Sequence, residues 1–304
     1  MDLTRLNDQY GIPGQLKFTQ RSNGFVLIEI ENNFAQATIS TYGGQVLSFK
    51  PVKESDDLLF VSKLARFEPG KAIRGGIPIC WPWFGPDPQS NDGPAHGLVR
   101  TRQWKICHAA LASDGAIKVI LSIHDSAETR KIWSHSFELS IIITIRESLT
   151  MELITRNTAS TPFTVTQALH AYFKIEDCQR VQISGLENTT YLDKTDAGKQ
   201  KSQHGPVTIS QEVDRIYTSA RSDLVLEDAA LSRNIRIHSK NSQTTIVWNP
   251  WKKKAAAMSD LDDNEFNTML CLETANAGAD SIIVSGNSEY SLEAQYQIVR
   301  TIAM

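Results

Sequence analysis

Apolar and polar residues alternate with a period of two along most of the chain. The alternation is clearest in five segments, 117–124, 137–145, 149–156, 244–249 and 290–299. In the last of these, Leu292 and Tyr296 fall on one side while Glu293 and Gln297 fall on the other. This pattern indicates β-strands that bury one face and expose the other.

Helical periodicity is scarce, and only 57–66 and 221–231 are expected to hold a turn or two of helix. Glycine-containing turns, such as those at 42–44, 113–115 and 285–287, separate the apolar runs. Strands do not alternate with helices, so parallel βαβ units are not expected. The pattern therefore predicts an all-β fold, a large antiparallel β-sandwich whose sheets pack face to face.

The chain has 304 residues, of which 41% are hydrophobic, enough for a sizeable core. It contains no linker, low-complexity tract or internal repeat. All-β folds often exceed about 200 residues as one unit, so we expect a single β-sandwich domain over 1–304. Strand edges could pair with another copy, but none is marked as an interface, and we expect a monomer.

The formal net charge of −3 gives no basic footprint, so nucleic acid is not an expected partner. No apolar run approaches the roughly 18 residues of a membrane span, and the first 15 residues lack the apolar stretch of a signal peptide. We therefore expect no membrane partner and a cytoplasmic location. The four cysteines lie far apart in the sequence and form no CxxC pair, so we expect them to be reduced thiols. They are Cys80, Cys107, Cys178 and Cys271.

The segment from Arg74 to Pro86, RGGIPICWPWFGP, fits neither a helix nor a regular strand, and PAHGLVR follows with His96 and Arg100. A long irregular segment in a compact fold is usually functional. Glycine lets the backbone approach a ligand closely, and proline stiffens a loop. We expect a rigid arm that presents Arg74. The aromatic residues expected to anchor this arm are Trp81, Trp83 and Phe84.

The segment 161–175 reads as a strand with one apolar face. The opposite face carries hydroxyl and aromatic groups together with His170, which suits a ligand-binding concavity better than open solvent. A hydrogen-bonded structural histidine is the alternative. The residues of this second face are Thr164, Thr166, Ala168, His170 and Tyr172.

Glu273 ends a mostly apolar run in MLCLETANAG, just before a turn at 276–278. A carboxylate at such a position is partly desolvated, and desolvation raises both its pKa and its basicity. A strand-end glutamate that reaches into water is the alternative. Two further candidates are Asp214 in QEVDRIY, which could be a solvent-facing charge, and Trp248 in VWNPW, which could stack on a sugar ring or fill the core.

Cofactor motifs are absent from the sequence. No HxH, HxxxH or HExxH spacing presets two metal ligands on one element, and there is no phosphate loop or GxSxG elbow. We therefore expect acid–base chemistry without a metal or another cofactor.

Six motifs occur in one order along the chain: RGGIPICWPWFGP, AHGLVR, ALHAYFKI, EVDRIY, VWNPW and LETANAG. Together they resemble the aldose 1-epimerase (mutarotase) superfamily, and more narrowly its hexose-6-phosphate branch, over roughly 40–299. The resemblance implies a galactose-mutarotase-like supersandwich and interconversion of the α and β anomers of a hexose 6-phosphate. One departure is Ala95 before His96, where some members carry a glutamine that can reach the ligand.

The resemblance also implies roles for individual residues. His170 and Glu273 match the family's catalytic histidine and glutamate, with Glu273 as the base toward the C1 hydroxyl and His170 as the acid toward the ring oxygen. The residues that match substrate contacts are Arg74, His96, Arg100 and Asp214. A glycosidase would instead use two carboxylates, Asp214 and Glu273, and leave His170 idle. A non-catalytic sugar-phosphate binding or regulatory module is the third possibility.

Overall fold

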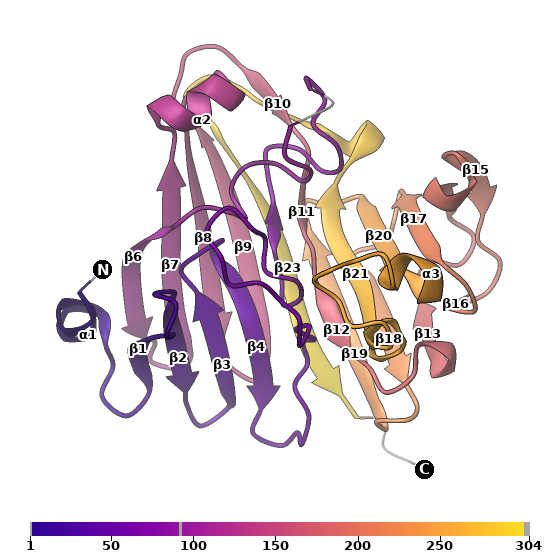
Figure 1. Ribbon diagram of the computed structural model, residues 1–304, viewed down its shortest axis with the longest axis horizontal. Coiled ribbons are helices and arrows are strands. Elements are labelled where there is room, and N and C mark those ends of the chain that lie inside the picture. The colour runs from indigo at the N-terminus through magenta and orange to yellow at the C-terminus, as the bar shows by residue number, and fades with distance from the viewer. Residues whose placement is uncertain (1, 91–92, 301–304) are drawn as a thin grey trace.

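The computed structural model describes residues 2–90 and 93–300, where most strands join large antiparallel sheets (Figure 1). The largest has nine strands in the order β16-β13-β18-β19-β23-β9-β8-β7-β6. Its strands are β6 (Lys105–Leu111), β7 (Ile117–His124), β8 (Phe137–Ile145), β9 (Ser148–Asn157), β13 (Val181–Ser184), β16 (Val207–Thr208), β18 (Asp223–Asp228), β19 (Arg233–Lys240) and β23 (Glu289–Val299).

Two further sheets pack on this one, so the predicted β-sandwich is confirmed. A four-stranded sheet contains β1 (Leu16–Gln20), β2 (Val26–Glu31), β3 (Ala35–Ser40) and β4 (Gln45–Pro51). An eight-stranded sheet contains β15 (Lys199–Ser202), β14 (Thr190–Asp193), β17 (Val213–Thr218), β20 (Thr244–Asn249), β21 (Met269–Asn276), β11 (Gln167–Leu169), β5 (Ile79–Cys80) and β12 (Tyr172–Lys174). The short strands β10 (Phe163–Val165) and β22 (Ile282–Val284) pair with each other.

The period-two pattern explains how the sheets bury one face. Along β8 every second residue is buried and the residues between are half-buried. Apolar side chains of the four-stranded sheet, such as Ile39 and Phe49, belong to the same core as Ile141 of β8. This shared core holds the four-stranded sheet against β6–β9, in front of which it lies in Figure 1.

Helices are short and lie at the ends of strands. They are the α-helices α1 (Leu3–Tyr10), α2 (Ala127–Ile132) and α3 (Trp251–Ala255), and the 3₁₀-helices η1 (Cys178–Arg180), η2 (Lys194–Asp196), η3 (Glu265–Thr268) and η4 (Gly278–Asp280). Within the described residues, no helix is long and apolar enough to cross a bilayer.

Both helical segments expected from the sequence are corrected. The stretch 221–231 contains strand β18, because it pairs with β13 on one side and β19 on the other. The stretch 57–66 is irregular and makes isolated bridges from Leu59 to Phe173 and from Val61 to Gly75. In both places cross-strand pairing prevails over local helical preference.

Candidate active site

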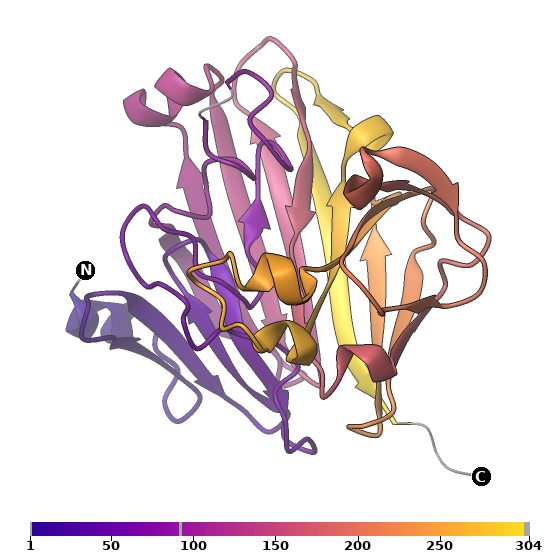
Figure 2. The same cartoon turned by 45° about the vertical axis from the view of Figure 1, so that its right-hand side comes forward.

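Strand register gathers one row of side chains on one face of the eight-stranded sheet. Asp214 of β17 lies opposite Trp248 of β20, Trp248 lies opposite Cys271 of β21, and Cys271 lies opposite Tyr172 of β12. Directly opposed residues share a face of the sheet. Glu273 lies two residues beyond Cys271 and therefore points to the same side. Figure 2 shows the segment with α3 and η3, coloured orange, lying over this part of the molecule.

His170 lies at a break between β11 and β12. The single strand expected over 161–175 is in fact three short strands, interrupted at Thr166 and again where the chain bends at His170 and Ala171. The backbone N–H of His170 donates to the Pro78 carbonyl (3.0 Å), and that of Tyr172 donates to the Gly76 carbonyl (2.9 Å). The bend thus fastens His170 to the Arg74–Pro86 segment that the sequence singled out.

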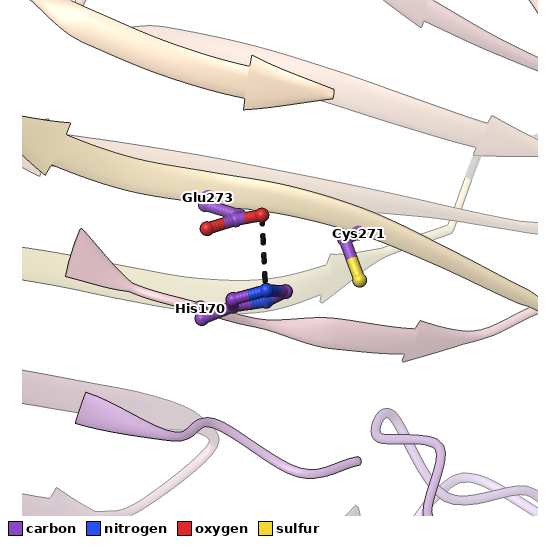
Figure 3. Close-up of side chains that lie close together, drawn as sticks. All are labelled: His170, Cys271 and Glu273. Atoms are coloured by element: carbon purple, nitrogen blue, oxygen red, sulfur yellow. Dashed lines mark ion pairs between the residues drawn. The ribbon is translucent and has the colours of Figure 1, made fainter. Parts of the chain in front are cut away.

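His170 and Glu273 face each other in the interior (Figure 3). The His170 Nδ1 atom lies 3.4 Å from Glu273 Oε1, and the two residues are 7% and 2% exposed. No hydrogen bond joins the two side chains, and His170 Nδ1 and Glu273 Oε2 have no hydrogen-bond partner among the residues described. Two unsatisfied buried polar groups of this kind mark a place where a ligand's hydroxyl groups can bind.

Glu273 lies within β21 and not at its end as expected. The strand continues to Asn276 because Thr274, Ala275 and Asn276 pair with β11. Its carboxyl group is consequently more deeply buried than the sequence indicated, and the alternative of a glutamate reaching into water is wrong.

Burial controls the protonation of the pair. Burial raises the pKa of Glu273 well above its usual value; the charge of Asp214 raises it further, and Arg100 opposes the effect. Burial also lowers the pKa of His170 well below its usual value, and His96 and Arg100 lower it further. A low-dielectric interior favours the neutral form of each group. Burial of the ligand-free pair therefore favours a protonated Glu273 carboxyl group beside an uncharged His170 imidazole.

His96 is held as a neutral hydrogen-bond donor. Its backbone adopts a positive φ of 61°, and its Nδ1 accepts a bond from the Gly85 N–H (3.3 Å). Burial, together with Arg100 and Arg74, lowers the pKa of His96 to about 3. A neutral imidazole whose Nδ1 accepts carries its proton on Nε2. The ring lies edge-on to His170, with centroids 5.7 Å apart.

Arg74 is held on two sides. Its Nε and Nη2 donate to the Asp260 carboxylate at 3.0–3.2 Å, and its Nη1 donates to the Tyr172 hydroxyl at 2.9 Å. Two glycines follow it, and a Cβ at Gly75 would lie 2.4 Å from the Phe60 carbonyl oxygen. The expected rigid segment is thus present, and two of its three aromatic residues, Trp81 and Trp83, are buried.

Arg100 is less constrained. Its Nη2 donates to the Ala95 carbonyl at 2.8 Å, and no carboxylate pairs with it within residues 2–90 and 93–300. Its charge nevertheless affects the pKa of His96, His170 and Glu273, which places it near the pair. The Ala95 side chain offers no polar group, but the Ala95 carbonyl orients this arginine.

Asp214 and Trp248 border the same region. Burial raises the pKa of Asp214, against the effect of Lys254, whose Nζ lies 3.7 Å from the carboxylate. The half-buried Trp248 ring stands edge-on to His170 and Tyr172, with centroids 6.3 and 6.1 Å away. Sequence reasoning missed Asp260, because nothing in SDLDDNEF distinguishes a loop acid from a partner of Arg74.

Three side chains have metal-ligating atoms close together. The ligand atoms of His170, Cys271 and Glu273 all lie within 4.8 Å of one another (Figure 3). Burial raises the pKa of the Cys271 thiol well above its usual value, whereas zinc binds the thiolate. The positive charges of Arg74 and Arg100 also act on His170. These residues fit a buried acid–base pair better than a cation site.

Comparisons with known proteins find a matching family model and similar chains. A family model described as aldose 1-epimerase matches residues 26–297. A protein of Cenchrus ciliaris named "Putative glucose-6-phosphate 1-epimerase" is 39% identical over 248 residues, which cover 79% of this chain and 74% of that protein. One of Escherichia coli with the same name is 33% identical over 252 residues, 83% of each chain. The crystal structure of a "putative mutarotase" from Salmonella typhimurium superposes with a TM-score of 0.89 at 28% identity, over 96% of both chains.

Proposed function

Because the chain belongs to the aldose 1-epimerase family, we propose that it interconverts the α and β anomers of a hexose 6-phosphate, with glucose 6-phosphate as the substrate. The observation that carries this proposal is the buried pair of His170 and Glu273, whose facing atoms are 3.4 Å apart and in which His170 Nδ1 and Glu273 Oε2 are unsatisfied. Anomer exchange needs one base and one acid beside the same C1–O5 unit, and this pair supplies both.

In the proposed reaction Glu273 takes the proton of the C1 hydroxyl while His170 gives a proton to the ring oxygen. The C1–O5 bond breaks, C1 becomes an aldehyde, and rotation about C1–C2 precedes closure on the other face. Closure returns both protons by the reverse path. The pair holds one proton before and after each step, so its total charge never changes, and no redox cofactor is needed.

Opening of the sugar ring requires that the single proton shared by the pair lie on His170 and not on Glu273. Burial alone places it on Glu273. A C1 hydroxyl that donates to Glu273 and a ring oxygen that accepts from His170 stabilise the carboxylate and the imidazolium respectively. The substrate thus brings the pair into its reactive protonation state.

The other residues of the site suit the remaining groups of the sugar phosphate. Arginine matches phosphate oxygens with a planar fork, which assigns the phosphate to Arg100 together with the remaining N–H of Arg74. His96 can donate from Nε2 to a sugar oxygen, and Asp214 can accept from a hydroxyl. Trp248 offers an apolar surface to the ring.

The test is the decay of freshly dissolved α-glucose 6-phosphate, followed by polarimetry or proton NMR with and without the protein. We expect the protein to accelerate the approach to the anomeric equilibrium, and the variant His170→Asn to abolish most of the acceleration. A protein that binds glucose 6-phosphate but leaves the decay unchanged would be a binding module. One that releases sugar from glycosides and leaves the decay unchanged would be a glycosidase.

A further inference from the structure

The proposed mechanism requires the His170 ring to be held in a fixed orientation beside Glu273, toward which its Nδ1 atom is directed. We propose that Tyr172 is the positioning residue that fixes this orientation, and that Arg74 and Asp260 in turn fix Tyr172. The inference rests on the proposed function, because it assigns a role to residues that support His170.

The first observation is the contact between the two rings. The rings of Tyr172 and His170 are parallel to within 6°, and their centroids are 4.7 Å apart. Residues i and i+2 of a regular strand are separated by about 6.6 Å. The bend at Ala171, whose N–H donates to the Leu169 carbonyl, allows the rings to approach more closely than that. A stacked neighbour restricts rotation of the imidazole about its Cβ–Cγ bond.

The second observation is that the tyrosine cannot move independently. Tyr172 is 2% exposed, and its hydroxyl accepts the 2.9 Å bond from Arg74 Nη1. The guanidinium of Arg74 is in turn held by both carboxylate oxygens of Asp260. A chain of contacts therefore runs from Asp260 through Arg74 and Tyr172 to His170.

The third observation is that hydrogen bonds join the loop that carries Asp260 to the loop beside Arg74. The buried Glu265 carboxylate accepts bonds from the Ser62 hydroxyl (2.6 Å), the Lys63 N–H (2.9 Å) and the Asp262 N–H (3.1 Å). The Ser62 N–H also donates to the Arg74 carbonyl (3.1 Å). Glu265 thus joins the loop of Asp260 to the loop beside Arg74.

Such an arrangement should affect turnover more than binding. Tyr172 acts through His170, and a displacement of about 1 Å of a catalytic group costs about 10²-fold in rate. Loss of the stacking ring should therefore lower kcat by about that factor. Because the Tyr172 hydroxyl also holds Arg74, which contributes to the proposed phosphate site, KM should rise by a smaller factor. Loss of the hydroxyl alone leaves the ring in place and should have a smaller effect.

The experiment compares Tyr172→Leu, which removes the ring, with Tyr172→Phe, which removes only the bond to Arg74. Tyr217→Phe is the matched control, because Tyr217 is also buried and its hydroxyl also accepts from an arginine, Arg215, at 3.4 Å. Tyr217 lies on the other face of β17 from Asp214. We expect kcat to fall strongly in Y172L and less in Y172F, and to be unchanged in Y217F.

The second readout needs no substrate. The ring nitrogens of His170, assigned in ¹⁵N NMR spectra by their loss in His170→Asn, report its tautomer and hydrogen bonding. We expect their chemical shifts to change in Y172L and to stay unchanged in Y217F. A folded Y172L protein with wild-type kcat, or with reduced kcat but unchanged His170 shifts, would overturn the positioning role.

The third arm tests the chain from Asp260. Asp260→Asn should lower kcat, and the double variant Y172F/D260N should be no worse than the more impaired single variant, because both changes interrupt one pathway. Fully additive losses would remove Asp260 from the role, and this arm decides the matter if Y172L does not fold. If wild-type protein fails to accelerate the decay of α-glucose 6-phosphate, the proposed function is wrong, while the NMR comparison still decides whether Tyr172 orients His170.

Discussion

Replacing Arg100 by alanine tests whether this chain recognises the phosphate. Arg100 makes one bond to the Ala95 carbonyl through Nη2, and its Nε and Nη1 lack a partner among residues 2–90 and 93–300. A hydrogen bond to a charged group contributes about 1.5–3 kcal/mol, a factor of roughly 10–150 in kcat/KM. We expect Arg100→Ala to lower kcat/KM for glucose 6-phosphate by that factor and to change turnover of free glucose little.

The structure also predicts the effect on stability and supplies a control. No described carboxylate loses its partner when Arg100 is removed, so the melting temperature should stay close to that of the wild type. Arg102→Ala removes the same charge two positions away. Arg102 pairs with the exposed Glu128 at 3.6 Å, so its loss should leave both activities unchanged.

The assay is the initial rate of α-anomer decay for glucose 6-phosphate and for glucose, corrected for the spontaneous reaction. Arg100→Lys should restore part of the activity toward the phosphorylated sugar, because a point charge cannot reproduce the fork of a guanidinium. Equal losses toward both sugars in R100A would refute a phosphate role. A loss of the same size in R102A would show that net charge alone is responsible.

Four further predictions concern the buried pair. His170→Asn should keep the fold and lower kcat by about 10²-fold or more, the usual contribution of a general acid, and near wild-type turnover in the folded variant would remove His170 from the mechanism. The pKa of His170 is held well below its usual value of about 6.5. The plateau of kcat/KM should therefore extend below that pH, once the substrate phosphate, which titrates near pH 6, is allowed for. An acid limb centred at 6.5 would contradict this. Because the pKa of Glu273 is raised in the folded protein, the wild type should lose stability as pH rises above the usual pKa of a glutamate. The melting temperature of Glu273→Gln relative to wild type should therefore increase between about pH 5 and about pH 8. A difference that stays constant with pH would argue against a buried carboxyl group. Excess EDTA should leave activity unchanged, and its loss would make Glu273 a metal ligand.

Much of the fold could be predicted from local alternation. The expected strands 117–124, 137–145 and 244–249 coincide with β7, β8 and β20. The prediction failed at 161–175, because alternation persists through a bend that tertiary hydrogen bonds impose at His170.

The site was less predictable from the sequence. The roles of its residues were inferred from the resemblance to a known family, and their proximity depends on the register of strand pairing. No local pattern reveals that Asp214 lies opposite Trp248, or that Arg74 meets Asp260 across 186 positions of sequence. A half-buried ion pair of this kind depends on two loops that pack only once the sheets have formed. The deep burial of Glu273 likewise follows from pairing on both sides of β21.

The row from Asp214 to Tyr172 also limits how such a chain can vary by insertion and deletion. One residue added within β21 before Cys271 would turn both Cys271 and Glu273 to the opposite face, since side chains alternate along a strand. The neighbours β20 and β12 hold β21 from both sides, so the strand cannot slip to compensate without breaking both ladders. Length changes in natural or engineered variants should therefore be confined to the connections between strands, such as the turn at 241–243 between β19 and β20.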